Sequence, residues 1–237
     1  MIELTEAPGT LPAGRRVYAI GDVHGCDERL AALHRRIADD LASRPVASPL
    51  LLHVGDYVDR GPDSAGVVRR LASGAPLPGV PVVNLVGNHE DTMLRALDGE
   101  RPSATDWLFS GGREALASWG VDPDSDRAGW LAAIPQADVA FVRALALWHR
   151  EGDYLFVHAG IRPGVRLEEQ ARSDLLTLRQ PFLTYEAPFG FVVVHGHTPT
   201  TNPQIKPNRI GIDTGAVFGG RLTCAVLEAG TVGFLHA

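Results

Sequence analysis

Short runs of Val, Ile and Leu recur along the chain, and polar residues follow most of these runs directly. Apolar runs of four to seven residues, bounded by turn-forming residues, are typical of buried strands. The pattern therefore predicts strands at residues 17–20, 50–54, 80–86, 154–157, 191–194, 209–212, 222–227 and 231–235.

Between the first two of these runs, apolar residues are spaced as in a helix. Residues 26–43 carry apolar side chains three or four positions apart, which predicts an amphipathic helix. These side chains are Leu30, Leu33, Ile37 and Leu41. Asp63 or Ser64 can cap a second helix, because short polar side chains accept hydrogen bonds from the free N–H groups of a first turn.

Residues 91–150 contain no strand-like run and carry short helical patterns at 93–97, 113–119 and 140–148. We expect a helical insertion there, within a single domain that spans residues 1–237. Strands alternate with helices early in the chain and follow one another late. This order predicts an α/β fold in which two packed mixed β-sheets are flanked by helices.

Charge and composition narrow the class of protein. The 237 residues include 22 Lys and Arg against 28 Asp and Glu, a formal net charge of −6, so no nucleic-acid partner is expected. No apolar run approaches the ~18 residues of a membrane span, and the acidic N-terminus, broken by Pro and Gly, does not resemble a signal peptide. With only Cys26 and Cys224, no disulfide framework is available, and we expect a cytoplasmic protein.

Five polar blocks stand directly after predicted strands. They are GDVHG at 21–25, GDYVDRG at 55–61, GNHE at 87–90, HAG at 158–160 and HGHT at 195–198. Ligands of open α/β sheets collect at the carboxyl ends of strands. Each block alone is compatible with a turn or an ion pair, but burying all of these charges together without a cation is costly.

The side chains of the blocks form a mixed oxygen and nitrogen donor set of carboxylates, an amide and imidazoles. Such a set suits Mn²⁺, Fe or Zn²⁺ better than it suits Ca²⁺. The donors exceed those that one tetrahedral ion needs, so we expect two divalent metal ions that share a carboxylate, with Mn²⁺ preferred and Fe or Zn²⁺ as alternatives. Two such ions lower the pKa of a shared water toward neutrality.

The blocks, in this order, resemble the phosphoprotein phosphatase family of dinuclear metallophosphoesterases, and the resemblance covers nearly the whole chain. The later stretches LLTLRQPFL, HGHTP and IDTGAVFGGRLT are similar to small bacterial and bacteriophage-lambda-type protein phosphatases. They are also similar to a sister group, the symmetrical diadenosine tetraphosphatases. The resemblance implies a calcineurin-like metallophosphoesterase fold.

The resemblance also implies metal ligands by position. Asp22 and His24 would hold the first ion, and Asp56 would bridge both ions. The remaining ligands of the second ion would be Asn88, His158 and His197. Because the family's last ligand follows the glycine of GH, His197 is preferred, and His195 is the alternative.

Catalytic and substrate-binding roles follow from the same resemblance. His89 would be the general acid that protonates the leaving oxygen, and Asp59 would orient its ring. Arg60 and Arg179, together with Asn88, would bind the phosphate oxygens. The family often carries Trp shortly before this second arginine, where the present chain has Thr.

The implied function is metal-dependent hydrolysis of a phosphoester by direct attack of water. We expect a serine/threonine protein phosphatase that also accepts phosphotyrosine, with a phosphorylated protein or a small phosphoester as substrate and a monomeric state. The alternative is a symmetrical diadenosine tetraphosphate hydrolase. An open groove would favour the phosphopeptide, whereas an aromatic slot would favour the dinucleotide. The intact set of site residues argues against a catalytically inactive binding module.

Residues outside the blocks receive a structural interpretation. The tryptophans expected to pack the helical insertion, with base stacking as an alternative for one of them, are Trp107, Trp119, Trp130 and Trp148. The histidines expected in the core or on the surface, without a catalytic role, are His34, His53, His149 and His236. Arg113 is a candidate to line the substrate groove.

Overall fold

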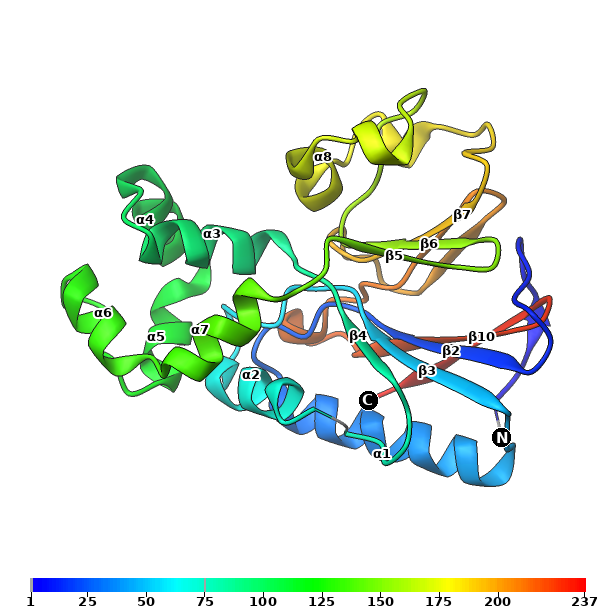
Figure 1. Cartoon of the computed structure of the whole chain (residues 1–237), viewed down its shortest axis with the longest axis horizontal. Coiled ribbons are helices and arrows are strands. Elements are labelled where there is room, and N and C mark those ends of the chain that lie inside the picture. The colour runs from blue at the N-terminus through cyan, green and yellow to red at the C-terminus, as the bar shows by residue number, and fades with distance from the viewer. Residues whose placement is uncertain (1, 75) are drawn as a thin grey trace.

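Two β-sheets stacked face to face form the centre of this computed structural model, which describes residues 2–74 and 76–237 (Figure 1). The first sheet has the strand order β1-β11-β10-β2-β3-β4. Its strands are β1 (Thr5–Glu6), β2 (Arg15–Ile20), β3 (Ser48–His53), β4 (Val82–Asn84), β10 (Thr223–Glu228) and β11 (Thr231–His236). The second sheet has the order β5-β6-β7-β9-β8. Its strands are β5 (Trp148–Glu151), β6 (Tyr154–Val157), β7 (Val192–His195), β8 (Gln204–Lys206) and β9 (Arg209–Gly211).

Helices cover the outer faces of both sheets and one end of the molecule. They are α1 (Asp27–Ser43), α2 (Ser64–Ala72), α3 (Asn88–Leu97), α4 (Arg101–Trp107), α5 (Arg113–Ser118), α6 (Arg127–Ala133), α7 (Gln136–Arg143) and α8 (Arg172–Thr177). A π-helical turn spans Leu108–Gly112, and 3-10 turns span Leu167–Glu169, Phe182–Thr184 and Ala216–Phe218. Within the described ranges, no helix has the length and apolar character needed to cross a membrane.

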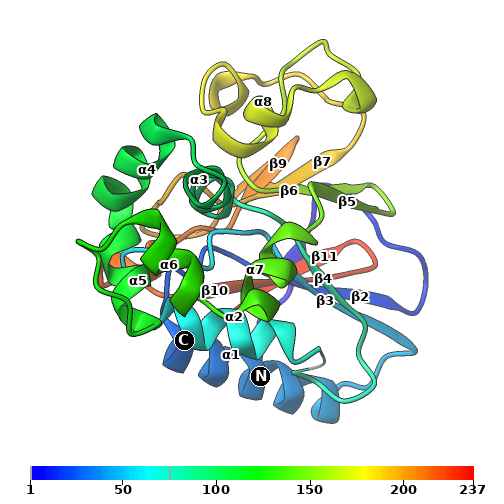
Figure 2. The ribbon, with the colours of Figure 1, turned by 60° about the vertical axis from the view of Figure 1, so that its left-hand side comes forward.

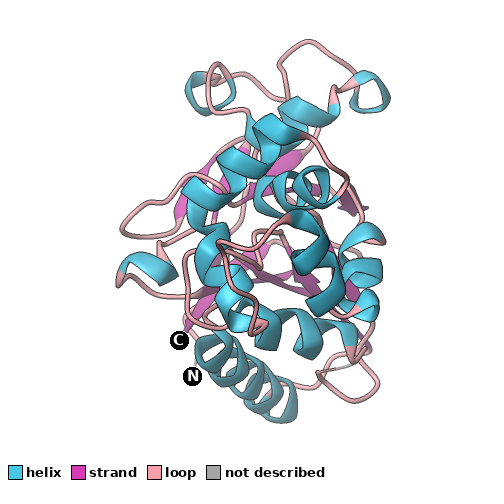
Figure 3. Cartoon of the chain, turned by 90° about the vertical axis from the view of Figure 1, so that its left-hand side faces the viewer, coloured by secondary structure: helices cyan, strands magenta, loops and turns pink. Residues whose placement is uncertain are grey.

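The arrangement is the predicted one, with two mixed sheets flanked by helices. Helices α1 and α2 lie along the outer face of the first sheet, and α8 lies beyond the second sheet (Figures 1 and 2). Helices α3 to α7 gather at one end, where they stand in front of the strands in the side view (Figure 3).

Side chains alternate across the first sheet as the period of two in a strand requires. Val17 and Ala19 of β2 lie in a core between the two sheets, together with Tyr154 and Phe156 of β6. Tyr18, which points the other way, joins a second core with the buried residues of α1 and α2. The apolar runs at residues 17–20 and 154–157 thus become strands that are buried on both faces.

The structure corrects several element bounds. The predicted strand at 80–86 shortens to β4, and the predicted helix at 140–148 ends with α7, so that Trp148 begins β5 instead. The sequence pattern missed β1, β5 and β8, which are short and polar. Every residue of β8 is exposed, so this edge strand carries no apolar signal.

The direction of the strands sets the location of the polar blocks. Strands β2, β3 and β4 run parallel to one another, and so do β6, β7 and β9. The blocks follow β2, β3, β4, β6 and β7. In both sheets the blocks therefore leave from the carboxyl ends of parallel strands.

A pair of buried histidines lies between α1 and β3. His34 and His53 face each other through their Nε2 atoms at 3.0 Å, and His53 Nδ1 donates to Asn84 Oδ1 at 2.8 Å. Burial lowers the pKa of His34 to about 4. Burial and the neighbouring His34 lower the pKa of His53 to about 3. Both rings belong to the core and stay neutral at neutral pH.

This pair predicts a loss of stability in mild acid. In the unfolded chain both rings have an ordinary pKa near 6.5, so unfolding takes up protons that the folded state does not bind. Between pH 7 and 5.5 each ring should lower the free energy of unfolding by about 1 kcal/mol. Urea unfolding at both pH values should show a loss about 1 kcal/mol smaller in His34→Gln than in the wild type. Equal losses in the two proteins would contradict this account.

Candidate functional site

The two carboxylate oxygens of Asp56 face two different imidazoles. Asp56 Oδ2 lies 3.4 Å from His24 Nε2, and Asp56 Oδ1 lies 3.3 Å from His158 Nε2. His24 Nδ1 donates to the carbonyl of Val58 at 2.9 Å, and His158 Nδ1 donates to the carbonyl of Val54 at 3.0 Å. Each of these bonds turns the Nε2 lone pair of its ring toward Asp56, the orientation typical of a metal-binding histidine.

Two groups of possible ligands therefore share Asp56. One contains His24, Asp56 and His89, and the other contains Asp56, His158 and His197, with the donor atoms of each group within 4.8 Å of one another. The side chains come from separate strand ends, so the topology rather than the local sequence brings them together.

Asn88 joins the second group. Its Oδ1 atom lies 3.0 Å from His158 Nε2 and 2.8 Å from His197 Nδ1. His195 points elsewhere: its Nδ1 contacts the carbonyl of Gly196, and its ring packs against that of Phe182. The geometry thus gathers the preferred histidine of the HGHT block and leaves the alternative outside.

Asp22 belongs to neither group of three, lies against the backbone of His197 and is almost fully buried. Both of its carboxylate oxygens accept from the backbone N–H of His197, at 3.2 and 3.0 Å. Burial raises the pKa of Asp22 well above its usual range, and the nearby carboxylates of Asp213 and Asp56 raise it further. Asp213, which the sequence analysis did not assign, comes from the IDTGA stretch and is buried too.

Glu90 holds the backbone around Asp56 in place. It is fully buried and accepts backbone N–H groups from Asp56 at 2.9 Å, Tyr57 at 2.7 Å, Val58 at 3.0 Å and Gly87 at 2.8 Å. Burial and the nearby Asp56 carboxylate raise its pKa to about 7, against the lowering effect of these donors. The last residue of the GNHE block therefore fixes the loop that carries the shared carboxylate.

The backbone of the site adopts unusual conformations. Five non-glycine residues of the site have positive φ angles between 43° and 74°, namely His24, Asp56, Asp59, Arg60 and His197. Such conformations cost on the order of 1–3 kcal/mol each and persist where the surroundings enforce them. At Gly87 a Cβ would collide with the Asp56 carboxylate, so this close approach requires glycine.

His89 and Asp59 form a buried pair. His89 Nδ1 lies 2.6 Å from Asp59 Oδ2, and His89 N donates to Asp56 Oδ1 at 3.1 Å. Burial lowers the pKa of His89, but the nearby carboxylates of Asp56 and Asp59 outweigh it and raise this pKa above its ordinary value. The ring is thus held in one orientation in an environment that favours its protonated form.

Two arginines reach the site from its exposed rim. Arg60 Nη1 lies 2.7 Å from His24 Nε2, and its guanidinium stands over the ring of Phe218 at 5.5 Å. Arg179 is exposed and lies close enough to His197 for its positive charge to lower the pKa of that histidine. Burial chiefly lowers the pKa of His197, to about 3, and the positive charge of this arginine contributes.

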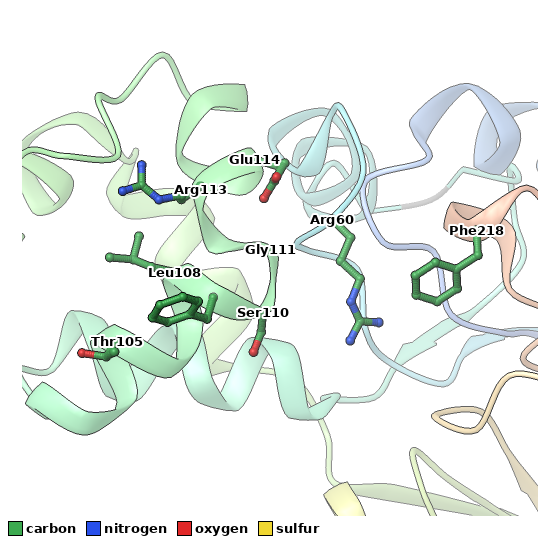
Figure 4. A pocket seen from close by; sticks show the side chains of 9 residues that line it. Arg60, Thr105, Leu108, Ser110, Gly111, Arg113, Glu114 and Phe218 are labelled. Carbon is green, nitrogen blue, oxygen red and sulfur yellow. The ribbon is translucent and has the colours of Figure 1, made fainter.

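A pocket of about 750 Å³ opens beside Arg60. Residues 108–111, 113 and 114 form one wall and Phe218 lies on the opposite side, with Arg60 between them (Figure 4). Arg113, a candidate to line the substrate groove, is one of the residues that line this pocket. Two phenyl rings at the pocket are largely exposed, Phe109 at 88% and Phe218 at 66%.

The tryptophans divide between two roles. Trp107, Trp119 and Trp130 are buried in the helical segment, as expected, and cannot stack on a base. Trp148 is wrongly assigned to that packing, because it begins β5 and is 38% exposed. The exposed aromatic rings beside the site are phenylalanines that the sequence analysis did not single out. Sequence alone gives no signal for them, because only tertiary structure places residues 109 and 218 at one pocket.

The donor set fits divalent cations. Five carboxylates of the site are buried, namely Asp22, Asp56, Asp59, Glu90 and Asp213. Burying this much negative charge is costly unless cations compensate it. Oxygen and nitrogen donors also converge in two groups with a shared carboxylate, the pattern expected for a two-metal site.

Comparison with known proteins identifies phosphoesterases as relatives of this chain. The sequence model of the calcineurin-like phosphoesterases matches residues 15–232. Serine/threonine-protein phosphatase 1 of Salmonella typhimurium is 30% identical over 229 residues, which cover 90% of this chain and 93% of that protein. The asymmetrical bis(5'-nucleosyl)-tetraphosphatase PrpE of Halalkalibacterium halodurans is 29% identical over 225 residues, 86% of this chain and 87% of that protein.

Solved structures share the fold. A crystal structure assigned to a diadenosine tetraphosphatase superposes with a TM-score of 0.69 at 24% identity, over 97% of this chain and 98% of that one. A cold-active protein tyrosine phosphatase superposes with a TM-score of 0.54 at 19% identity, over 92% of this chain and 77% of that one. At these identities the likeness concerns the fold alone.

Proposed function

Because the chain belongs to the calcineurin-like phosphoesterase family and is therefore a phosphoester hydrolase, we propose that it works with two divalent cations that share Asp56. One observation carries this proposal: the two oxygens of this carboxylate face separate imidazoles, those of His24 and His158, at 3.4 and 3.3 Å. A carboxylate between two ligand groups is what a bridging ligand requires.

The remaining ligands divide between the two groups. As the family resemblance implies, Asp22 and His24 would hold one cation with Asp56, and the carboxylates of Asp22 and Asp56 are near enough to raise the pKa of Asp22. The other would be held with Asp56 by Asn88, His158 and His197. When bound, the two cations favour deprotonation of water and neutralise charge on the phosphoryl oxygens.

The chain's own residues bind the phosphate and complete the reaction. Arg60 and Arg179 supply forked N–H donors, which pair with phosphoryl oxygens in charge-assisted hydrogen bonds. The side-chain amide of Asn88 would also bind a phosphoryl oxygen. The two arginines approach from the solvent side, so they can meet a substrate as it enters.

His89 donates a proton to the leaving oxygen as its bond to phosphorus breaks. The 2.6 Å contact with Asp59 holds the proton on Nδ1 and keeps the other nitrogen of the ring available for the substrate. Asp59 compensates the positive charge of the imidazolium before the transfer. Attack by water is direct, because no residue of the site is placed as a covalent nucleophile in our assignment.

We propose phosphoserine and phosphothreonine proteins as the substrates, with phosphotyrosine proteins as a further class. The rim supports this choice, since a pocket of about 750 Å³ lies beside the exposed Arg60, which would bind the phosphate. Such an open pocket accepts a phosphorylated side chain together with its flanking residues. The 30% identity to a serine/threonine phosphatase over nearly its whole length agrees with it.

A second candidate is hydrolysis of a dinucleoside polyphosphate. The observation that favours it is the pair of exposed phenyl rings, Phe109 and Phe218, because bases stack on exposed aromatic faces. Relatives named as tetraphosphatases support the same candidate.

A single comparative assay separates the two candidates. Removal of metal by a chelator should abolish turnover, and reloading with Mn²⁺ should restore it more fully than Fe²⁺, Zn²⁺ or Mg²⁺. The reloaded protein should then show kcat/KM at least ~10-fold higher on a phosphoserine peptide than on diadenosine tetraphosphate, a difference of about 1.4 kcal/mol in transition-state binding. A preference of this size for the dinucleotide would favour the second candidate instead.

We further propose that the chain acts as a monomeric, cytoplasmic enzyme whose single domain, residues 1–237, contains the helical insertion 91–150. Both cysteines are free, Cys26 half-buried and Cys224 buried, which agrees with a reducing compartment.

A further inference from the structure

The Asp59 carboxylate is held by two donors, one on each oxygen. His89 Nδ1 lies 2.6 Å from Oδ2, and the indole Nε1 of Trp107 donates to Oδ1 at 2.8 Å. The backbone N–H of Asp59 donates to Ser64 Oγ at 2.9 Å. Because an indole N–H can only donate, Trp107 fixes which oxygen is left for the histidine.

The helical insertion, which contains Trp107, also supports the backbone of the loop that carries Asp59. Asp59 and Arg60 have φ angles of 74° and 68°, conformations that only the surroundings can maintain. Arg60 N donates to the carbonyl of Gly111 at 3.2 Å, and a Cβ on this glycine would collide with the Arg60 backbone. Residues 107–111 thus contact the loop at both its side chain and its main chain.

Trp107 itself is rigidly placed. Its side chain is fully buried, and its ring meets that of Trp130 edge to face at 5.6 Å. A Cβ at Gly112 would collide with the Trp107 ring, so the chain passes directly against it. Such packing fixes the position from which the indole donates.

We propose that Trp107 is a positioning residue for proton donation by His89, which it serves by holding the Asp59 carboxylate in place. This inference rests on the proposed function, in which His89 protonates the leaving oxygen as the phosphorus–oxygen bond breaks. Without the indole N–H, one oxygen of Asp59 is left buried and unpaired, and the carboxylate is free to rotate away from the imidazole.

The dependence of turnover on the leaving group isolates this role. An alkyl phosphate leaves as a strongly basic alkoxide and needs the proton, whereas 2,4-dinitrophenyl phosphate leaves as a stable phenolate and does not. In Trp107→Phe, which keeps an aromatic ring but removes the N–H, kcat on phosphoserine should fall by ~10-fold or more. On the dinitrophenyl ester kcat should change by less than about 2-fold, with KM unchanged for both substrates.

The chain offers a matched control in the same helical segment. Trp119 is also buried and donates through Nε1 to a buried carboxylate, Asp138 Oδ2, at 2.8 Å. Trp119→Phe removes the same kind of bond away from Asp59. It should leave the ratio of the two kcat values as in the wild type.

Three results decide the proposal. A folded, metal-loaded Trp107→Phe protein with the wild-type ratio would overturn it, and so would an equal change of the ratio in Trp119→Phe. Should the phenylalanine variant not fold, 3-benzothienylalanine at position 107, which has the shape of tryptophan without its N–H, gives the same test. His89→Asn distinguishes failure of this inference from failure of the proposed function. If this variant leaves the ratio of the two kcat values unchanged, His89 is not the general acid and the inference about Trp107 is wrong as well.

Discussion

Replacing Asp56 by asparagine is expected to remove both cations and to cause the largest loss of turnover among single substitutions at the site. The amide carries no charge, and one of the two oxygens that face His24 and His158 becomes an NH₂ group. Both ligand groups lose their shared member at once. The loss of kcat should therefore exceed the roughly 10²–10⁴-fold contribution of a general acid. Elemental analysis of the purified protein, with a phosphoester assay on the same sample, measures both effects.

Asp138→Asn is the matched control for this substitution. Asp138 is also a buried carboxylate, but it accepts from the Trp119 indole in the helical segment and contacts none of the ligand groups. Its variant should keep two cations per chain and normal turnover. An Asp56→Asn protein with two cations and normal turnover would show that this carboxylate does not bridge them.

Replacing His89 by asparagine is expected to lower kcat on phosphoserine by ~10²–10⁴-fold, the usual contribution of a general acid, without loss of metal. The ring is buried and its Nδ1 is engaged by Asp59, so its remaining nitrogen is the group available to the substrate. Steady-state kinetics on the metal-loaded variant provide the measurement.

The metal content of the same variant tests the alternative role of His89. This histidine also belongs to the first ligand group, with His24 and Asp56. If His89→Asn loses a cation along with its activity, the residue is a ligand and not the acid. His34→Asn, which removes a buried imidazole from α1 away from the site, should retain both cations and full kcat.

The sequence could indicate the site because the strands and the polar blocks are contiguous in the chain. A run such as residues 50–54 must be buried on both faces of a sheet, and GDYVDRG follows it without a linker. Parallel strands then bring these blocks to common edges. Asp56 and Asn88 are 32 positions apart in the chain, but they follow the neighbouring parallel strands β3 and β4, so the sequence indicates that they lie near each other.

The support around the site was harder to predict. Glu90 stands inside the GNHE block, but its four N–H donors belong to backbone whose path is known only after folding. Asp213 lies in a recognisable stretch, yet its approach to Asp22 depends on how the chain returns after β9. The sequence thus shows which residues carry a carboxylate, but it does not show which groups these carboxylates contact after folding.

The helical segment shows the same limit. Its tryptophans predicted packing, which is correct for Trp107, but the hydrogen bond of the indole to Asp59 crosses 48 positions of the chain. No local pattern encodes such a contact. Strand β5 was missed for a related reason, since its sequence WHRE alternates exposed and half-buried positions and lacks an apolar run.

Anomalous diffraction from a crystal of the Mn²⁺-loaded protein tests the central claim most directly. The account predicts two peaks, ~3.5–4 Å apart, with Asp56 contacting both ions. Asp22 and His24 should complete one ion, and the other should be completed by Asn88, His158 and His197. A single peak between these side chains, no peak at all, or two ions bound without Asp56 would contradict it.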